Sequence, residues 1–402
     1  MVSTHAEAIK KIKRGIDETV PEGMLEEKLE KARKENRPLR VKLGVDPSSP
    51  DLTLGHAVVL KKLRDFQDLG HTAVLVVGDF TRRIGDPSGR SHTRNTMTAK
   101  QIDENMATYE KQVFRILNPE KTEIRYNSEW LSKLTFEDII ELTAKYTVAR
   151  MLERDDFSSR FSNNQPISIL EFLYPLAQAY DSVAIDADIE LGGTDQRFNL
   201  LIGRHIQEEF GQPPQGILTM PLIEGTDGVK AMSQTRGNYI GINEPPEQVF
   251  GKIMSLPDRI MDKYFLTLTD VNPNDLKELH PKDKKKSLAR EIVADIYSKV
   301  EAEHAQEEFE KVFEENEKPS NLEEIEITEE EIKDDGTIWI VDLVEKTGFV
   351  SSRSEAKRII KQGGVKLDDK KIDTIDFDPL LDEEKIIQIG KTKFAKIKPL
   401  GL

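Results

Sequence analysis

The chain has 402 residues, a formal net charge of −15 and no cysteine. The lack of cysteine excludes disulfide bonds, thiolate metal ligands and cysteine nucleophiles. No apolar run approaches the ~18 residues of a membrane span, and no apolar stretch follows the lysines near the N-terminus. We therefore expect a cytoplasmic protein of two or three domains with no membrane partner.

The negative charge is concentrated in one segment. Residues 301–335 contain 16 Asp and Glu but only 3 Lys and Arg. The global charge would argue against binding to nucleic acid, but most of it comes from this segment. The charge of each domain must therefore be considered separately.

The first predicted elements are two charged helices within residues 4–36, interrupted at residues 20–23. Residues 39–45 alternate apolar and polar side chains, which predicts a strand, and residues 72–79 form a continuous apolar strand. The helical pattern between them completes a parallel β-α-β unit. Further along the chain, the patterns predict strands at 122–126, 184–191 and 216–220, and helices at 99–117, 136–145, 166–181 and 195–210.

This order of elements predicts an α/β fold, with a Rossmann-like parallel sheet covered by helices on both faces. After residue 245 the pattern is helical and broken by prolines. Residues 317–336 are polar and acidic, and the last segment combines a basic helix with short strands. The predicted organisation is N-terminal helices at 1–38, a Rossmann-like domain at 39–245, a helical domain at 246–316, an acidic linker at 317–336 and a small α+β domain at 337–402.

The turn after the first apolar strand has the features of an anion site. It is rich in Pro, Asp and Ser, and Thr53, Gly55 and His56 stand at the start of the next helix. Free N–H groups and the helix dipole favour an anionic ligand there. Gly55 lets a nucleotide approach the backbone, and His56 can donate to a phosphate oxygen. A helix-capping turn with an incidental histidine is the alternative interpretation.

Two further segments offer groups for an amino-acid ligand. Asp86 follows the second strand, where ligands bind in open parallel sheets, and its carboxylate can hold an ammonium group. Tyr174, Gln178 and Asp181 share one helical face. There, Asp181 and Tyr174 would bind the ammonium group of an amino acid, and Gln178 its polar edge. The alternatives are a simple Gly-Asp-Pro turn and a satisfied polar network in the core.

Two loops complete the candidate site. Residues 192–196 begin with two glycines, which allow a ligand to approach closely, and Asp195 can accept hydrogen bonds from ribose hydroxyls. The polar loop at 228–238 can close over phosphates, with Lys230 or Arg236 stabilising developing charge. The alternatives are a strand-to-helix turn with a capping Asp or Thr and an ordinary surface loop.

Together, and in this order, these segments resemble the bacterial tyrosyl-tRNA synthetases, a class I family. Residues 53–56 resemble the HIGH motif of that family, and residues 231–235 stand in the place of its KMSKS motif. Long stretches at 146–157 and 171–183 match as well. Residues 351–365 resemble an S4-type RNA-binding module, whose helix has a basic face suited to phosphates. The resemblance covers the whole chain.

The resemblance implies a ligase that joins tyrosine to AMP, with loss of pyrophosphate, and then passes the tyrosyl group to the 3′ end of tRNA(Tyr). It implies ATP as a substrate with Mg2+, no metal site in the protein, and a homodimer whose helical domain lies on the anticodon side. The residues it implies are Thr53, His56, Ser48, Lys230 and Gln234 for catalysis; Ser48, Gly55, His56, Gly193, Asp195, Met232, Ser233 and Gln234 for ATP; Lys42, Gly44, Asp86, Tyr174, Gln178, Asp181 and Gln196 for tyrosine; and Arg353, Lys357, Arg358 and Lys361 for RNA.

The chain departs from the family pattern at its catalytic motifs. Thr53 replaces the first histidine of the HIGH motif, and Lys42 stands where some relatives have a tyrosine that contacts the substrate phenol. Ala231 and Gln234 replace both lysines of the KMSKS motif. Losing one such donor typically costs about 3–4 kcal/mol of transition-state stabilisation.

Two hypotheses therefore follow. The first is a tyrosine–tRNA ligase, either fully active or impaired by the loop changes. The second is a paralogue that has lost adenylation and serves as a tyrosine- or RNA-binding protein. A tryptophan-specific relative is disfavoured by the S4-like tail and by the three polar residues on one helical face.

Overall fold

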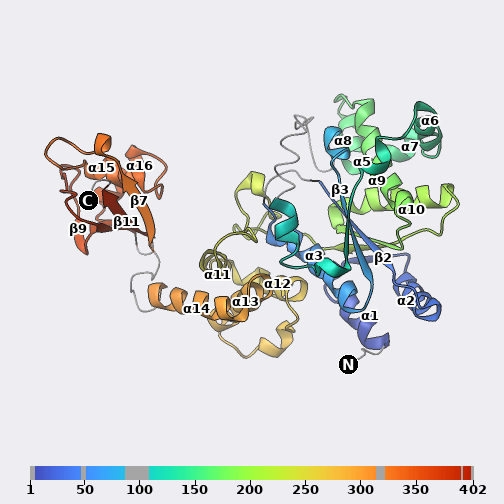
Figure 1. Cartoon of the computed structure of the whole chain (residues 1–402), viewed down its shortest axis with the longest axis horizontal. Coiled ribbons are helices and arrows are strands. Elements are labelled where there is room, and N and C mark those ends of the chain that lie inside the picture. Colours follow the sequence, from blue (N-terminus) through green and yellow to red (C-terminus); the bar gives the residue numbers. More distant parts are fainter. Residues whose placement is uncertain (1–4, 47–50, 87–107, 314–321, 391–392, 400–402) are drawn as a thin grey trace. The chain divides into compact units, whose positions relative to one another are not determined.

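The computed structural model describes residues 5–46, 51–86, 108–313, 322–390 and 393–399. The chain divides into two compact units, residues 1–302 and 303–402. Each unit contains one β-sheet (Figure 1). Within the described residues, no helix combines the length and the apolar character that crossing a membrane requires.

The sheet of the first unit has six strands in the order β1-β6-β5-β2-β3-β4. All neighbouring strands from β2 to β6 pair in parallel, whereas β1 pairs antiparallel with β6 at the edge. The predicted α/β class is thus confirmed, with one antiparallel strand added. The strands are β1 (Glu18–Val20), β2 (Arg40–Val45), β3 (Thr72–Val77), β4 (Thr122–Tyr126), β5 (Ile189–Gly193) and β6 (Gly216–Met220).

Two predicted elements of this unit need correction. The N-terminal segment was predicted as helices alone, but β1 lies between α1 (His5–Lys13) and α2 (Met24–Glu35). Three residues are too few for an alternating pattern to be seen. The strand predicted at 184–191 begins only at Ile189, because α9 (Ile169–Ala184) runs on to Ala184. The turn between them buries Ile185 and Ala187, which imitate strand alternation in the sequence.

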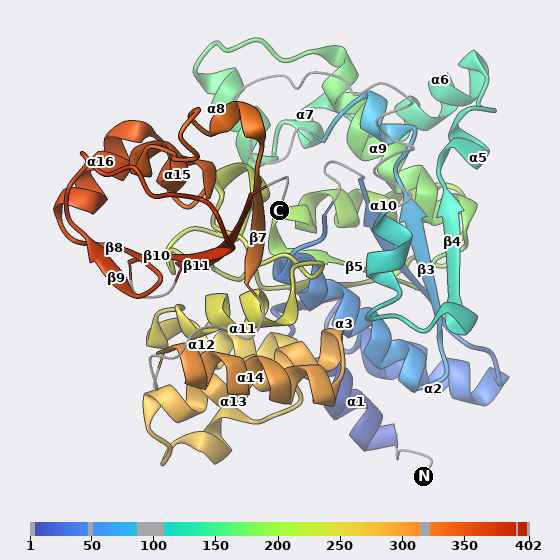
Figure 2. The same cartoon turned by 60° about the vertical axis from the view of Figure 1, so that its left-hand side comes forward.

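Helices cover both faces of this sheet. Helix α3 (Leu54–Asp68) lies on one face, and α9 and α10 (Arg197–Glu209) lie on the other (Figures 1 and 2). Residues 108–113 are also helical, and the first part of the helix predicted at 99–117 lies outside the described residues. The shorter helices are α5 (Ser128–Leu131), α6 (Phe136–Ala144), α7 (Val148–Met151) and α8 (Asp155–Ser162).

The segment after residue 245 is helical, as the pattern predicts. Its helices are α11 (Pro246–Met254), α12 (Met261–Leu268), α13 (Pro281–Ile296) and α14 (Lys299–Phe313). Prolines stand in the first turns of α11 and α13, where a missing N–H costs nothing. Proline therefore starts these helices and interrupts none of them.

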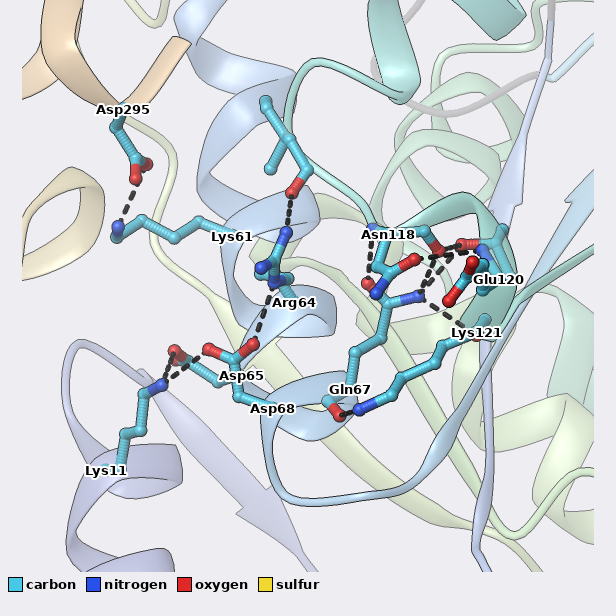
Figure 3. A network of polar contacts seen from close by, with 12 residues as sticks. Lys11, Lys61, Arg64, Asp65, Gln67, Asp68, Asn118, Glu120, Lys121 and Asp295 are labelled. Carbon is cyan, nitrogen blue, oxygen red and sulfur yellow. Dashed lines mark hydrogen bonds and ion pairs between the residues drawn. The ribbon is translucent and has the colours of Figure 1, made fainter. Parts of the chain in front are cut away.

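Polar contacts anchor the C-terminal half of α3, as Figure 3 shows. Arg64 donates to the carbonyl oxygen of Ile116 at 3.0 Å, and Lys61 pairs with Asp295 of α13 at 2.9 Å. Gln67, which is fully buried, donates to the carbonyl oxygen of Lys121 at 2.9 Å. These contacts tie α3 to three other parts of the unit, so the position of its N-terminus is fixed by the fold.

The second unit has a five-stranded sheet in the order β7-β11-β10-β8-β9. Strand β7 (Glu323–Ile327) pairs in parallel with β11 (Lys393–Pro399), so the prediction of a linker is wrong for these residues. Its glutamates alternate with the buried Ile325 and Ile327, a strand pattern that the acidic composition obscures. The other elements are α15 (Ile340–Lys346), α16 (Arg353–Lys361), β8 (Val365–Leu367), β9 (Lys370–Ile372) and β10 (Lys385–Ile389).

Candidate active site

A cavity of about 420 Å³ lies at the carboxyl ends of β2, β3 and β5. The chain order reverses there, since β2 has β3 on one side and β5 on the other, and open α/β sheets bind ligands at such a point. The cavity brings together most of the residues predicted from the sequence. Those that line it are Gly44, Thr53, Gly55, His56, Asp86, Tyr174, Gln178, Asp181, Gly193, Asp195, Gln196 and Met232.

The N-terminus of α3 presents a neutral histidine to the cavity. Thr53 caps the helix, and its backbone N–H donates to His56 Nδ1 at 3.1 Å. Because Nδ1 accepts, the proton lies on Nε2, the other ring nitrogen. Burial lowers the pKa of His56 to about 4, although the side chain is exposed where it faces the cavity. The lowered pKa favours a neutral His56 whose Nε2–H can donate a hydrogen bond.

Two carboxylates lie close together, Asp46 directly after β2 and Asp86 in the segment that follows β3. Asp46 accepts hydrogen bonds from Tyr174 at 2.9 Å and from Thr81 at 3.1 Å, and Gln196 donates to Asp86 at 3.1 Å. Burial and the nearby charge of Asp86 raise the pKa of Asp46 to about 6. The pair is an electronegative site that a cation would stabilise.

Backbone geometry helps to seat Asp46. At Gly78, just after β3, a Cβ atom would lie 2.0 Å from Asp46 Oδ1, so only glycine leaves room for this carboxylate. On α9, the side-chain oxygen of Gln178 is buried and has no hydrogen-bond partner among the described residues. Gln178 also lines the cavity, so this oxygen is available to a ligand.

Asp181 has different neighbours from the Asp46 and Asp86 pair. Its carboxylate accepts hydrogen bonds from Trp130 Nε1 at 2.8 Å and from Asn127 Nδ2 at 3.3 Å. Burial raises the pKa of Asp181 to about 7. The Tyr174 hydroxyl donates to Asp46, and both Tyr174 and Asp181 line the cavity, so their joint binding of one ammonium group stays a prediction.

Lys42 does not line the cavity, although the resemblance places it against the substrate. Its side chain is fully buried on β2, and its ammonium group pairs with Glu190 at 2.9 Å. It also donates to Ser182 Oγ at 2.8 Å and to the carbonyl oxygen of Gln178 at 3.1 Å. Lys42 therefore lies behind the cavity wall.

The loop that stands in the place of the KMSKS motif is attached to the site through several contacts. Ala231 and Met232 line the cavity, whereas Lys230, Ser233 and Gln234 do not. The backbone N–H of Met232 donates to Ile223, and that of Ser233 donates to the side chain of Asn238, both at 2.9 Å. Gln234 begins the 3-10 helix η4 (Gln234–Arg236).

The two basic residues beside this loop differ in their availability. Arg236 donates to the carbonyl oxygen of Ala231 at 3.0 Å. Lys230 is exposed, and within the described residues no hydrogen bond or ion pair engages its ammonium group. Of the two, Lys230 is the cation free to move toward a phosphate. Ser48, predicted for ATP and catalysis, lies outside the described residues.

The predicted RNA-binding residues lie on α16 of the second unit. Arg353, Lys357 and Lys361 are spaced four residues apart, so they follow one face of the helix. Arg353 pairs with Asp342 at 2.8 Å and with Glu345 at 3.0 Å. Lys357 lies over the Trp339 ring, 5.0 Å from its centroid. The charge of Arg353 is thus partly neutralised. Arg353, Arg358 and Lys361 are all exposed, and Arg358 has one longer ion pair, with Glu355 at 3.7 Å.

The structure adds residues that the sequence did not single out. Asp46 and Glu190 line the cavity, and Asn127 and Trp130 hold Asp181. The cavity also includes the buried Tyr109. Asp46 was detectable, since it directly follows the first apolar strand. Glu190 lies in the predicted strand just before Gly192, but a charged residue in a strand is no signal of a site, and the others lie in no recognisable motif. Across the part of the chain that is described, no three His, Asp or Glu side chains gather as metal ligands.

Comparisons with known proteins agree with this arrangement. The model of the family "tRNA synthetases class I (W and Y)" matches residues 34–314, and that of the S4 domain matches residues 338–378. The chain is 52% identical to the tyrosine–tRNA ligase of Thermotoga maritima, covering 98% of both chains. It is 51% identical to that of Carboxydothermus hydrogenoformans, covering 96% of both.

Solved structures show the same fold. The tyrosyl-tRNA synthetase of Archaeoglobus fulgidus, complexed with L-tyrosine, has a TM-score of 0.59 at 22% identity, covering 75% of this chain and 99% of that one. A truncated mitochondrial enzyme from Aspergillus nidulans has a TM-score of 0.63 at 21% identity, covering 77% and 94%. The chain belongs to the bacterial tyrosyl-tRNA synthetases, within the class I tRNA synthetase family.

Proposed function

We propose that this chain is a tyrosine–tRNA ligase that uses ATP, as its Mg2+ complex, to form tyrosyl-adenylate and then charges tRNA(Tyr). The observation that carries the proposal is the arrangement of carboxylates in one cavity. Asp46 and Asp86 lie together beside Tyr174, and Asp181 has a separate set of hydrogen-bond donors. An amino acid that carries both an ammonium group and a phenol hydroxyl matches these two kinds of site.

Tyrosine would bind with its ammonium group at the acidic pair. The Asp86 and Asp46 carboxylates and the unpartnered oxygen of Gln178 supply acceptors for it. The phenol hydroxyl would donate to Asp181, which retains lone pairs beyond those that Trp130 and Asn127 use. Phenylalanine cannot make this bond and would leave the buried carboxylate under-satisfied, so it would be rejected.

ATP would bind across the N-terminus of α3. Gly55 and Gly193 leave the backbone open to the nucleotide, Asp195 would accept from ribose hydroxyls, and Thr53 and His56 would donate to phosphate oxygens. A carboxylate oxygen of tyrosine then attacks the α-phosphorus, and the bond to pyrophosphate breaks. The neutral His56 stabilises the charge that develops on the phosphate, and catalysis is otherwise a matter of positioning.

The second step needs only the bound adenylate and the tRNA. A hydroxyl of the 3′-terminal adenosine attacks the tyrosyl carbonyl carbon, and AMP leaves. Arg358 and Lys361 of α16, assisted by Lys357, would contact tRNA phosphates. We place this reaction in the cytoplasm, where protein synthesis consumes charged tRNA.

The substitutions in the loop should slow the first step. Ala231 cannot supply charge, and Gln234 offers only a neutral donor, so the pyrophosphate charge is less well stabilised. The exposed Lys230 would compensate in part. This loop is also the observation that favours the alternative, a paralogue that binds tyrosine or RNA without adenylation.

We propose that two copies of this chain associate through α6 to α9. Six large apolar side chains in residues 136–170 are exposed, among them Phe136 and Ile169 at 80% each. Buried residues of the same helices share one core cluster, so these helices form a single structure. Such a concentration of exposed apolar side chains is typical of an interface. Light scattering should give twice the 45.7 kDa chain mass, and Ile169→Glu should give the monomer.

Charging of tRNA tests the proposed function directly. Purified full-length chain, ATP, Mg2+ and tRNA(Tyr) should form tyrosyl-tRNA from labelled tyrosine but not charge the tRNA with labelled phenylalanine or tryptophan. Tyrosine binding without charging or adenylate formation would instead support the paralogue. Charging with tryptophan would overturn the assignment of the amino acid.

A further inference from the structure

A buried ion pair joins Glu190, which lines the cavity, to Lys42 behind the cavity wall. Lys42 on β2 and Glu190 on β5 are 0% and 1% exposed in their side chains, and their charged atoms are 2.9 Å apart. Burying two charges is costly even when they are paired, and hydrophobic replacements are often neutral or stabilising. Stability alone therefore gives a weak account of this pair.

The contacts of Lys42 point to Asp181. Its ammonium group donates to the carbonyl oxygen of Gln178 at 3.1 Å and to Ser182 Oγ at 2.8 Å. Gln178 and Ser182 are one helical turn apart on α9, and Asp181 lies in that turn. The ammonium group thus holds the turn that presents Asp181 to the cavity.

Glu190 is held from three directions. It pairs with Lys42, accepts from Ser182 Oγ at 3.2 Å, and accepts from the side-chain nitrogen of Gln215. The α10 backbone approaches this group closely at Gly203, where a Cβ atom would lie 2.7 Å from that nitrogen and 3.2 Å from Glu190. These contacts hold both the Lys42 ammonium group and the Glu190 carboxylate in place.

We propose that the Lys42–Glu190 pair is a positioning element of the tyrosine pocket, which fixes the turn carrying Asp181 and balances its charge, while the Lys42 ammonium group stays outside the cavity. The proposal rests on the proposed function, in which Asp181 accepts the hydroxyl of tyrosine. Lys42 and Glu190 act on Asp181 with opposite signs. The pKa of Asp181 is therefore set by two opposing charges.

The groups that face Asp181 come from several elements. Lys42 on β2 and Glu190 on β5 are the charged ones, and Trp130 of α5 and Asn127, at the end of β4, are neutral donors. Tyr174 is the titratable neighbour on α9 itself. Asp46 is connected more remotely, since Asn127 also donates to Thr81 at 3.0 Å and Thr81 donates to Asp46.

The sign of each effect follows from these charges. Burial raises the pKa of Asp181 to about 7, the charge of Lys42 lowers it, and the charge of Glu190 raises it. Because the ionised carboxylate accepts the tyrosine hydroxyl, tyrosine affinity should fall as the pH drops through about 7. Removing Lys42 should move this midpoint upward, and neutralising Glu190 should move it downward.

The test is the pH dependence of L-tyrosine affinity, measured by calorimetry on the full chain without ATP. Lys42→Met should raise the midpoint by about one pH unit, and Glu190→Gln should lower it by about one unit. Ser182→Ala removes a hydrogen bond from both groups but no charge, so its midpoint should stay at the native value. Damage to packing would weaken binding at every pH and could not move the two midpoints in opposite directions.

Midpoints that stay fixed, or that move in the same direction, would overturn the proposal. If Lys42→Met does not fold, Glu190→Gln alone decides, because only a downward shift agrees with the proposed charge balance. Asp181→Ala distinguishes a failure of the positioning role of the ion pair from a failure of the proposed tyrosine pocket. Unchanged tyrosine affinity in that variant would contradict the proposed pocket itself, whatever the midpoints of the other variants.

Discussion

The side-chain amide of Gln234 donates a hydrogen bond to the backbone carbonyl oxygen of Asp51, 2.9 Å away. Asp51 precedes the Thr53 cap of α3, so this bond joins the substituted loop to the turn in front of the proposed ATP site. Gln234, which stands in place of a catalytic lysine, thus links the loop to this turn through a hydrogen bond. It can hold the loop in place, but it cannot supply positive charge.

Restoring the two lysines should accelerate adenylate formation. Ala231→Lys with Gln234→Lys should raise the rate at least about tenfold, since each charged donor stabilises the departing pyrophosphate. Apparent ATP affinity should change much less, because such contacts strengthen only as charge develops. Single-turnover kinetics measures both quantities.

Gln234→Met is the matched control, because it removes the hydrogen bond to Asp51 without adding charge. It should lower the rate of adenylate formation. If the restored loop gives no gain, Lys230 already supplies the charge. Lys230→Ala in the native loop should then cause the large loss.

Tyrosine binding should depend on Asp181 more than on any other polar contact with the phenol. Asp181→Ala should weaken the affinity for tyrosine more than tenfold, because the hydroxyl loses a charged acceptor. Affinity for phenylalanine should change little or improve. Calorimetry with both amino acids measures the difference, and equal losses for the two would show that the substitution damages the pocket as a whole.

Asp46 should destabilise the folded chain at neutral pH. Its pKa is raised from 3.8 to about 6, so the fold disfavours the ionised form, and this penalty is complete above pH 6 and absent below about pH 4. Asp46→Asn should therefore raise the melting temperature at pH 8, and the unfolding free energy should rise by about 3 kcal/mol. Calorimetric scans at pH 8 and pH 4 should show the gain disappearing at the lower pH.

The exposed Asp155, in the first turn of α8, gives a matched control. Asp155→Asn should not stabilise the chain at pH 8. An Asp46→Asn gain of equal size at both pH values would mean that packing, and not the buried charge, explains the effect.

The basic face of α16 should contribute unequally to tRNA binding. Lys361→Ala should weaken tRNA affinity and reduce the slope of log affinity against log salt by about one, because one phosphate contact is lost. Arg353→Ala should have a smaller effect, since Asp342 and Glu345 already pair with that side chain. Filter binding over a salt series compares the two variants, and tyrosine activation should stay unchanged in both. A larger loss for Arg353→Ala would contradict the role given to these pairs.

The sequence predicted correctly those features whose residues lie close together along the chain. Strands β4 and β6 begin and end at the predicted residues. Strand β6 is an apolar run, and in β4 two charged side chains alternate with Thr122, Ile124 and Tyr126. Thr53, Gly55 and His56 stand within four residues, and Tyr174, Gln178 and Asp181 share a helical period, so their convergence on one cavity is a local property.

What the sequence could not provide depends on contacts between distant residues. The roles of Asn127 and Trp130 appear only when α5 packs beside α9, and Lys42 looked like a substrate ligand until Glu190, 148 positions later, was seen to pair with it. Strand β7 was missed for a related reason. Its partner β11 lies near the other end of the unit, and its acidic composition matched that of a linker.

Tyrosine-dependent exchange of labelled pyrophosphate into ATP is the most direct test of the central claim, because it reports adenylate formation without tRNA. The full chain should catalyse exchange with tyrosine, and not with phenylalanine or without an amino acid. His56→Ala should lower that rate, and Ala231→Lys with Gln234→Lys should raise it. No tyrosine-dependent exchange in either the native chain or the lysine-restored variant would contradict the account and leave a paralogue that binds tyrosine or RNA without activating it.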